Sequence, residues 1–69
     1  MMSWMLVLFL FVMEPSGRYH TEMRVVPQIF TTQQECAQRY ANMKVGEIRL
    51  KPGERLVRAY GRCEVEYDI

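Results

Sequence analysis

The chain has 69 residues, of which 49% are hydrophobic and 25% are charged, and its formal net charge is +1. This composition is too apolar for a disordered chain and not apolar enough for an integral membrane protein, so residues 1–69 should fold as a single domain. A core of this size supplies about 3–5 kcal/mol unless a disulfide, a metal or a partner chain adds to it. Charges of both signs are interspersed without a basic patch, so nucleic acid is not an electrostatically favoured partner.

The first element is the run of ten apolar residues from Trp4 to Met13, "WMLVLFLFVM". A helix of this length would span about 15 Å, roughly half of a bilayer's hydrocarbon core. An export signal would need a positive segment before the run and a small-residue cleavage site after it, and neither pattern is present. The aromatic and β-branched residues, followed by a Pro-Ser-Gly turn, favour instead a strand that is buried on both faces. We therefore expect a location in the cytoplasm and no association with a membrane.

The second element follows a turn that contains Pro15 and Gly17. Residues 19–26 alternate in character, which predicts a strand that forms a β-hairpin with the first. Pro27 cannot donate a hydrogen bond to a ladder, so it should end this strand or place it at an edge. One side of the strand carries Tyr19, Thr21, Met23 and Val25, and the other carries His20, Glu22, Arg24 and Val26.

The third element is a helix in "FTTQQECAQRYANMK". Thr32 and Glu35 have the spacing of a capping box, and the pattern predicts a helix over 33–44 with Gly46 as its C′ residue. One helical face collects the apolar side chains of Cys36, Ala37, Tyr40, Ala41 and Met43.

The last elements surround Pro52 and Gly53, which are typical of a type II turn. Ile48 and Leu50 before the turn predict a short extra strand, and regular alternation over 57–67 predicts a long, half-buried final strand. One face of the final strand carries Val57, Ala59, Gly61, Cys63, Val65 and Tyr67, and the other carries Arg58, Tyr60, Arg62, Glu64 and Glu66.

These elements predict an α+β fold with ββαβ topology, in which a small antiparallel sheet has one helix on one face. The strand order would be second, first, last, with the optional extra strand beside them. One helix can cover one face, so the other would keep an apolar stripe between charged flanks. A sheet-on-sheet homodimer would cover that stripe, and a bent sheet is the competing solution. The expected interface comprises Trp4, Leu6, Leu8, Leu10, Arg58, Tyr60 and Arg62.

The candidate sites for chemistry are few. Cys36 and Cys63 are 27 residues apart and could meet as a disulfide or as paired core thiols, and the thiols are favoured because no export signal is present. His20 is the one histidine, and we expect it to be a solvated strand residue. No spacing suits metal binding, a cofactor, a phosphate loop or acid–base chemistry, so the chain is predicted not to be an enzyme.

The pattern as a whole resembles small uncharacterised accessory proteins of tailed bacteriophages and prophages. The residues that carry the resemblance are the opening "SWMLVLFLFV", the polar hairpin, "FTTQQECAQRYA" and the cysteine-containing "GRCEVEYDI". The inserted "EIRLKPGER" and the acidic tail depart from it. The resemblance implies expression in an infected bacterial cell and an accessory role, such as binding and inhibiting a host or anti-phage defence protein.

Three hypotheses for function therefore compete. The first is a protein-binding module that acts by steric occlusion. The second is a sheet that binds RNA or a single strand, suggested by Tyr19, Tyr60, Arg58 and Arg62. The third is a small protein associated with a membrane or the cell envelope.

Overall fold

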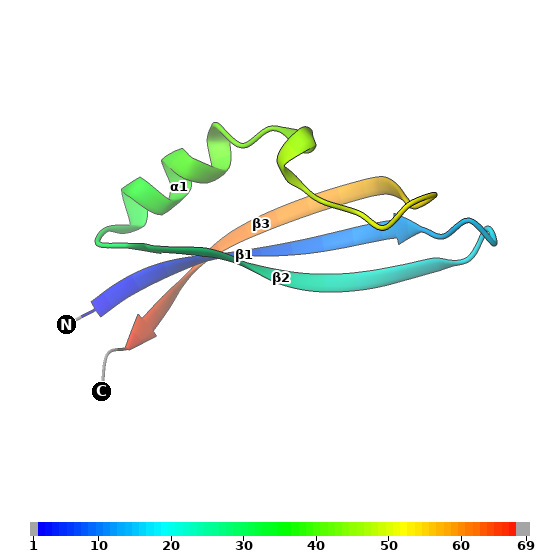
Figure 1. Cartoon of the computed structure of the whole chain (residues 1–69). Helices are drawn as coiled ribbons and strands as arrows, with labels where there is room; N and C mark the ends of the chain where they lie inside the picture. The colour runs from blue at the N-terminus through cyan, green and yellow to red at the C-terminus, as the bar shows by residue number, and fades with distance from the viewer. Residues whose placement is uncertain (1, 68–69) are drawn as a thin grey trace.

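The computed structural model describes residues 2–67 and contains, within them, one three-stranded antiparallel sheet and one α-helix (Figure 1). The elements are β1 (Met2–Met13), β2 (Tyr19–Phe30), α1 (Gln33–Ala41), a 3₁₀ turn (Val45–Glu47) and β3 (Arg55–Tyr67). The sheet order is β2-β1-β3, with both flanking strands antiparallel to β1. The predicted α+β fold and strand order are confirmed.

The core is built on the even-numbered side chains of β1. Leu6, Leu10 and Val12 are fully buried, and Leu8 is nearly so. Alternation along a strand places these four side chains on one face of the sheet, where α1 and the segment after it lie. Each fully buried Leu or Val side chain contributes about 1.5–3 kcal/mol relative to exposure, so this single row supplies a large part of the driving force for folding.

The helix covers only one end of this row, and the irregular segment between α1 and β3 covers the other end (Figure 1). Ile48 and Leu50 pack on the core from this segment, and the extra strand that the prediction left optional does not form among residues 2–67. The core needs the apolar side chains of Ile48 and Leu50 as cover. A loop can place these side chains on the core as well as a strand can. The molecule is accordingly thin, with Cα extents of 45 × 25 × 15 Å.

Pro27 lies inside β2 and does not end it. Met5 pairs with Ile29 and Val7 pairs with Val25, so three residues of β2 stand opposite one residue of β1. This register shift takes Pro27 out of the hydrogen-bonded ladder, as its missing N–H requires. Because β2 is an edge strand, the placement of Pro27 at an edge is confirmed.

The helix begins as predicted and ends earlier. The Thr32 hydroxyl accepts a hydrogen bond from the Glu35 N–H at 3.1 Å, which caps the N-terminus. The helix ends at Ala41 instead of residue 44, because the chain turns at Asn42 into the 3₁₀ turn. Gly46 lies within that turn without a positive φ, so its assignment as the C′ residue is wrong.

Two glycine turns meet at the end of the sheet that is distant from α1. Gly17 has φ +88° in the hairpin turn, and Gly53 has φ +84° in the predicted Pro-Gly turn. The Glu54 N–H donates to the Lys51 carbonyl at 3.1 Å, as expected for a four-residue turn. A Cβ on Gly53 would lie 2.7 Å from Pro15 Cγ, so the two turns are in close contact.

Cys36 of α1 and Cys63 of β3 are joined as a disulfide, with 6.0 Å between their Cα atoms. This corrects the preference for two reduced thiols. Cys63 pairs with Leu6 in the register and shares its face of the sheet, which brings its sulfur under the buried Cys36. Beside the bond, Tyr40 lies so close over Gly61 that a Cβ there would stand 2.6 Å from Tyr40 Cδ1. The helix is therefore fixed to β3 by a covalent bond and by a close aromatic contact.

We expect the disulfide to contribute about 3.5 kcal/mol to the free energy of unfolding, because it closes a 27-residue loop in the unfolded chain. Urea denaturation followed by far-ultraviolet circular dichroism, with and without a thiol reductant, measures this contribution. The double variant C36A/C63A should match the reduced protein and should not respond to reductant. Equal unfolding midpoints for the oxidised and reduced protein would contradict the expectation.

Candidate functional site

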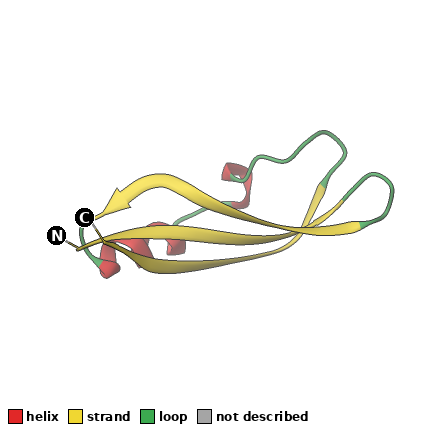
Figure 2. Cartoon of the chain, turned by 90° about the horizontal axis from the view of Figure 1, so that it is seen from below, coloured by secondary structure: helices red, strands yellow, loops and turns green. Residues whose placement is uncertain are grey.

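The face of the sheet opposite α1 has no covering element among residues 2–67 (Figure 2). Odd-numbered side chains of β1 form its centre, and the register places one residue of each flanking strand beside each of them. We call this surface the open face. It comprises Met5, Val7, Phe9 and Phe11 of β1, Thr21, Met23, Val25 and Ile29 of β2, and Arg58, Tyr60, Arg62 and Glu64 of β3.

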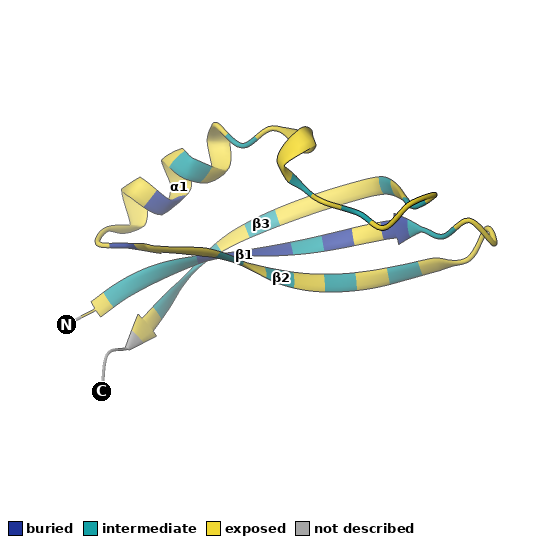
Figure 3. Cartoon of the chain, in the orientation of Figure 1, coloured by how far each residue is buried: buried dark blue, intermediate teal, exposed yellow. Residues whose placement is uncertain are grey.

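Exposure on the open face is greatest at its flanks (Figure 3). Val7 in the centre is only 3% exposed, whereas Met23 and Ile29 on β2 are 65% and 67% exposed. Side chains of the outer strands therefore shield part of β1, which the sequence did not predict. The apolar surface in contact with water comes mainly from β2, with Phe11 and Tyr60 beside it.

The charges of the open face lie on one flank only. Arg58, Arg62 and Glu64 all belong to β3, where Arg62 Nε lies 3.7 Å from a Glu64 oxygen. Arg58 forms no ion pair with any side chain that the structure describes. The β2 flank is uncharged, because the charged side chains of that strand point to the opposite face, so the expectation of charge on both flanks is wrong.

A shallow hollow of about 460 Å³ lies at the β3 side of the open face. It is lined by Phe9, Phe11, Arg58, Tyr60 and Arg62. The rings of Phe9 and Tyr60 are tilted, with centroids 6.3 Å apart. This arrangement offers aromatic surface next to two guanidinium groups.

The structure separates the predicted interface residues into two groups. Arg58, Tyr60 and Arg62 are exposed together on the open face. Trp4, Leu6, Leu8 and Leu10 lie on the other face and pack in the core, so they cannot form an interface. The even and odd residues of β1 are equally apolar, and only the direction of the crossover decides which set α1 covers. Tyr19 also lies apart from Tyr60, because it pairs with Met13 near the hairpin turn.

His20 is the centre of a charged cluster on the covered face, near the two glycine turns. Its Nδ1 lies 2.9 Å from a Glu14 oxygen, and its Nε2 lies 2.8 Å from a Glu22 oxygen. Arg24 Nε donates to the second Glu22 oxygen at 2.9 Å, and a Glu54 oxygen lies 3.9 Å from Nε2. Alternation places His20, Glu22 and Arg24 on one face, as expected, whereas Glu14 and Glu54 approach through the two turns. His20 is a strand residue, as expected, and its side chain is 30% exposed, but both ring nitrogens contact carboxylates instead of water alone.

Hydrogen bonds to Glu22 and Glu14 raise the pKa of His20 above its ordinary value. The hydrogen bonds from His20 and then from Arg24 lower the pKa of Glu22. Within residues 2–67, His20, Glu22 and Glu54 form a group with metal-ligand atoms within 4.8 Å of one another. Both ring nitrogens already contact carboxylates, so a metal ion could bind His20 only by displacing one of these contacts.

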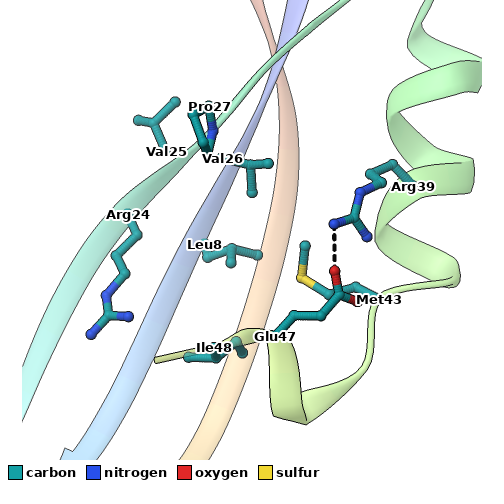
Figure 4. Close-up of a pocket in the computed structure, with 9 residues that line it drawn as sticks. All are labelled: Leu8, Arg24, Val25, Val26, Pro27, Arg39, Met43, Glu47 and Ile48. Atoms are coloured by element: carbon teal, nitrogen blue, oxygen red, sulfur yellow. Dashed lines mark hydrogen bonds and ion pairs between the residues drawn. The ribbon is translucent and has the colours of Figure 1, made fainter. Parts of the chain in front are cut away.

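A smaller cavity of about 200 Å³ lies between β2 and the segment after α1 (Figure 4). It is lined by Leu8, Arg24, Val25, Val26, Pro27, Arg39, Met43, Glu47 and Ile48. Arg39 and Glu47 pair across it at 2.5 Å, and Arg24 pairs with Glu22. The charged groups are therefore already partnered, and this cavity offers none to orient a small ligand.

The His20 cluster should make stability depend on pH. Because folding raises the pKa of His20, the protonated side chain stabilises the folded state. This contribution to the free energy of unfolding is complete below about pH 6.5 and is lost as the pH rises through the folded-state pKa. The lowered pKa of Glu22 means that its contribution is present above about pH 4.5 and is lost as the pH falls through the folded-state pKa. Melting temperatures should therefore fall from about pH 6 to about pH 9.

The matched control for this dependence is H20N, which removes the titrating group. Its melting temperature should lie below that of the unmodified chain at about pH 6, and the difference should shrink as the pH rises. If the melting temperatures of the two proteins change with pH in parallel, the titration of His20 does not contribute to the pH dependence of stability.

Residues 2–67 include no helix with the length and apolar character needed to cross a bilayer. No known protein family, curated protein or solved structure matches this chain. Its function is accordingly inferred from the open face.

Proposed function

We propose that this chain is a small non-enzymatic protein-binding module and that the open face is its binding surface. The observation that carries the proposal is the patch of Met23, Val25, Ile29, Phe11 and Tyr60, each between 44% and 67% exposed on one side of a thin molecule. Soluble monomers rarely leave large contiguous apolar patches in water, and such patches commonly mark interaction sites. The β3 charges would form part of a polar rim.

The resemblance to phage accessory proteins supports a partner of a particular kind. A host or anti-phage defence protein would be bound over the open face and inhibited by steric occlusion, in the cytoplasm of the infected bacterial cell. The chemistry of the face favours a partner surface with an apolar centre and an acidic group that could meet Arg58.

The disulfide between Cys36 and Cys63 has a consequence for the proposed cytoplasmic location. The cytosol keeps thiols reduced, so a cytoplasmic form would carry Cys36 and Cys63 as thiols and would lose the stabilising cross-link. Cys63 faces α1, and the open face lies on the other side of the sheet. The disulfide therefore lies outside the proposed binding surface.

The variant M23D tests the proposal. It places a charge on a side chain that is 65% exposed, so the fold should persist, while burial of an unpaired carboxylate at the interface should weaken binding about 30-fold or more. Immobilised protein and M23D are compared for the bacterial proteins that they retain from infected-cell lysate, with circular dichroism to confirm folding. The matched control is Q34D on the exposed surface of α1.

Q34D should retain the same protein as the unmodified chain. Identical retention by M23D would overturn the proposal, and so would the absence of any protein retained by the unmodified chain. L8D should unfold, because Leu8 is only 5% exposed within the core.

A second candidate function is favoured by the hollow on the β3 side. Phe9, Phe11 and Tyr60 provide stacking surface, and Arg58 and Arg62 provide cations for phosphates, which is how sheets bind single-stranded nucleic acid. Fluorescence anisotropy with a labelled oligonucleotide at low salt tests it. Binding that falls steeply with added salt and is lost in R58A would favour this candidate over the first.

A further inference from the structure

We propose that the open face of the free protein pairs with the open face of a second copy across a two-fold axis. The inference rests on the proposed function, because it uses the same surface, and it names the occupant of that surface when no other partner is bound. The register of the sheet and the order of side chains along β3 determine which residues such a pair of copies would bring together.

The open face consists of four rows across the sheet. The first row holds Met5 with Ile29 and Glu64, and the second holds Val7 with Val25 and Arg62. The third row holds Phe9 with Met23 and Tyr60, and the fourth holds Phe11 with Thr21 and Arg58. A two-fold axis perpendicular to the strands and midway along these rows would place the first row against the fourth and the second against the third.

This axis makes the charged flank complementary to itself. The open-face side chains of β3, in chain order, are Arg58, Tyr60, Arg62 and Glu64. The partner's β3 would lie over them in the reverse direction. Arg58 then meets the partner's Glu64, and Tyr60 meets the partner's Arg62. The first pair is an ion pair, and the second is a cation–aromatic contact. Arg58, which has no ion-pair partner among the described side chains, gains one.

The same axis keeps the centre of the interface apolar. Val7 meets the partner's Phe9, and Met5 meets the partner's Phe11. On the β2 flank, Val25 meets the partner's Met23. Sheets that pack face to face lie about 10 Å apart, with their strands within about 30° of alignment, so side chains of this size fill the space between them.

The other in-plane axis, parallel to the strands, is unfavourable. It would place the partner's β3 over β2, with Arg62 against Val25 and Glu64 near Ile29. Both charged groups would lose water without gaining a partner, which costs free energy. The charge pattern therefore selects the axis perpendicular to the strands.

Charge-reversal substitutions at Arg58 and at Glu64 test this geometry. R58E and E64R each replace the two symmetric ion pairs with like-charge contacts, and each should weaken self-association roughly 10-fold to 100-fold. In an equimolar mixture, the carboxylate introduced by R58E meets the guanidinium introduced by E64R. The unchanged Glu64 of the first variant meets the unchanged Arg58 of the second, so both contacts are attractive again. Sedimentation equilibrium at micromolar concentration should give twice 8.2 kDa for the unmodified chain and for the mixture.

The double variant R58E/E64R is the matched control, since it carries both exchanges and should self-associate like the unmodified chain. Non-reducing electrophoresis must show that no disulfide joins the copies. The proposal is overturned if the unmodified chain sediments as a single species of 8.2 kDa, if R58E associates as tightly as the unmodified chain, or if the mixture stays monomeric.

The outcomes separate this inference from the proposed function. A monomeric chain that still retains a bacterial protein, lost in M23D, would sustain the function and refute the pairing of copies. A dimer that obeys the charge exchange and retains no other protein would sustain the pairing and refute the function. If both are correct, the partner competes with the second copy, and E64R, which breaks the pairing of copies and leaves Arg58 unchanged, should retain more partner than the unmodified chain does.

Discussion

The two apolar faces of β1 impose the constraint on which the rest of the molecule depends. A central strand that pairs on both edges can satisfy its backbone within the sheet, but its side chains still need cover above and below. The chain supplies that cover on one side, through α1 and the segment that contains Ile48 and Leu50. The other side receives only the partial shielding of its neighbouring strands, which makes Val7 buried and leaves Phe11 exposed.

The two ends of the covered face are held by different chemistry. At the α1 end, the disulfide and the contact of Tyr40 with Gly61 join the helix to β3. At the other end, hydrogen bonds and ion pairs of His20 join the hairpin turn to β2, and Glu54 lies within 3.9 Å. Both ends of the covered face are therefore fixed by contacts that do not involve the open face.

The sheet and its order were predictable because they follow from local alternation and from the length of the connections. The continuous apolarity of residues 4–13 places that strand in the centre, and Pro27 places the next strand at an edge. Local sequence could not decide which face α1 covers, and for this reason the sequence-based prediction places Leu6, Leu8 and Leu10 on the uncovered face, where the structure has Met23 and Ile29. It also could not show that Ile48 and Leu50 pack as loop residues, or that Glu14 and Glu54 approach His20, because these contacts join distant parts of the chain.

The pairing of β1 with β3 joins one end of the described chain to the other, with Met2 opposite Tyr67. A ribosome adds roughly 5–20 residues per second, so the last residue of β1 is made roughly 2–8 s before the first residue of β3. During that interval one edge of the most apolar strand has no neighbour to pair with, and the cysteine that will hold α1 has not been made. An unpaired apolar edge is the feature that chaperones bind and that aggregates recruit. The topology that protects β1 in the finished protein therefore exposes it for longest during synthesis.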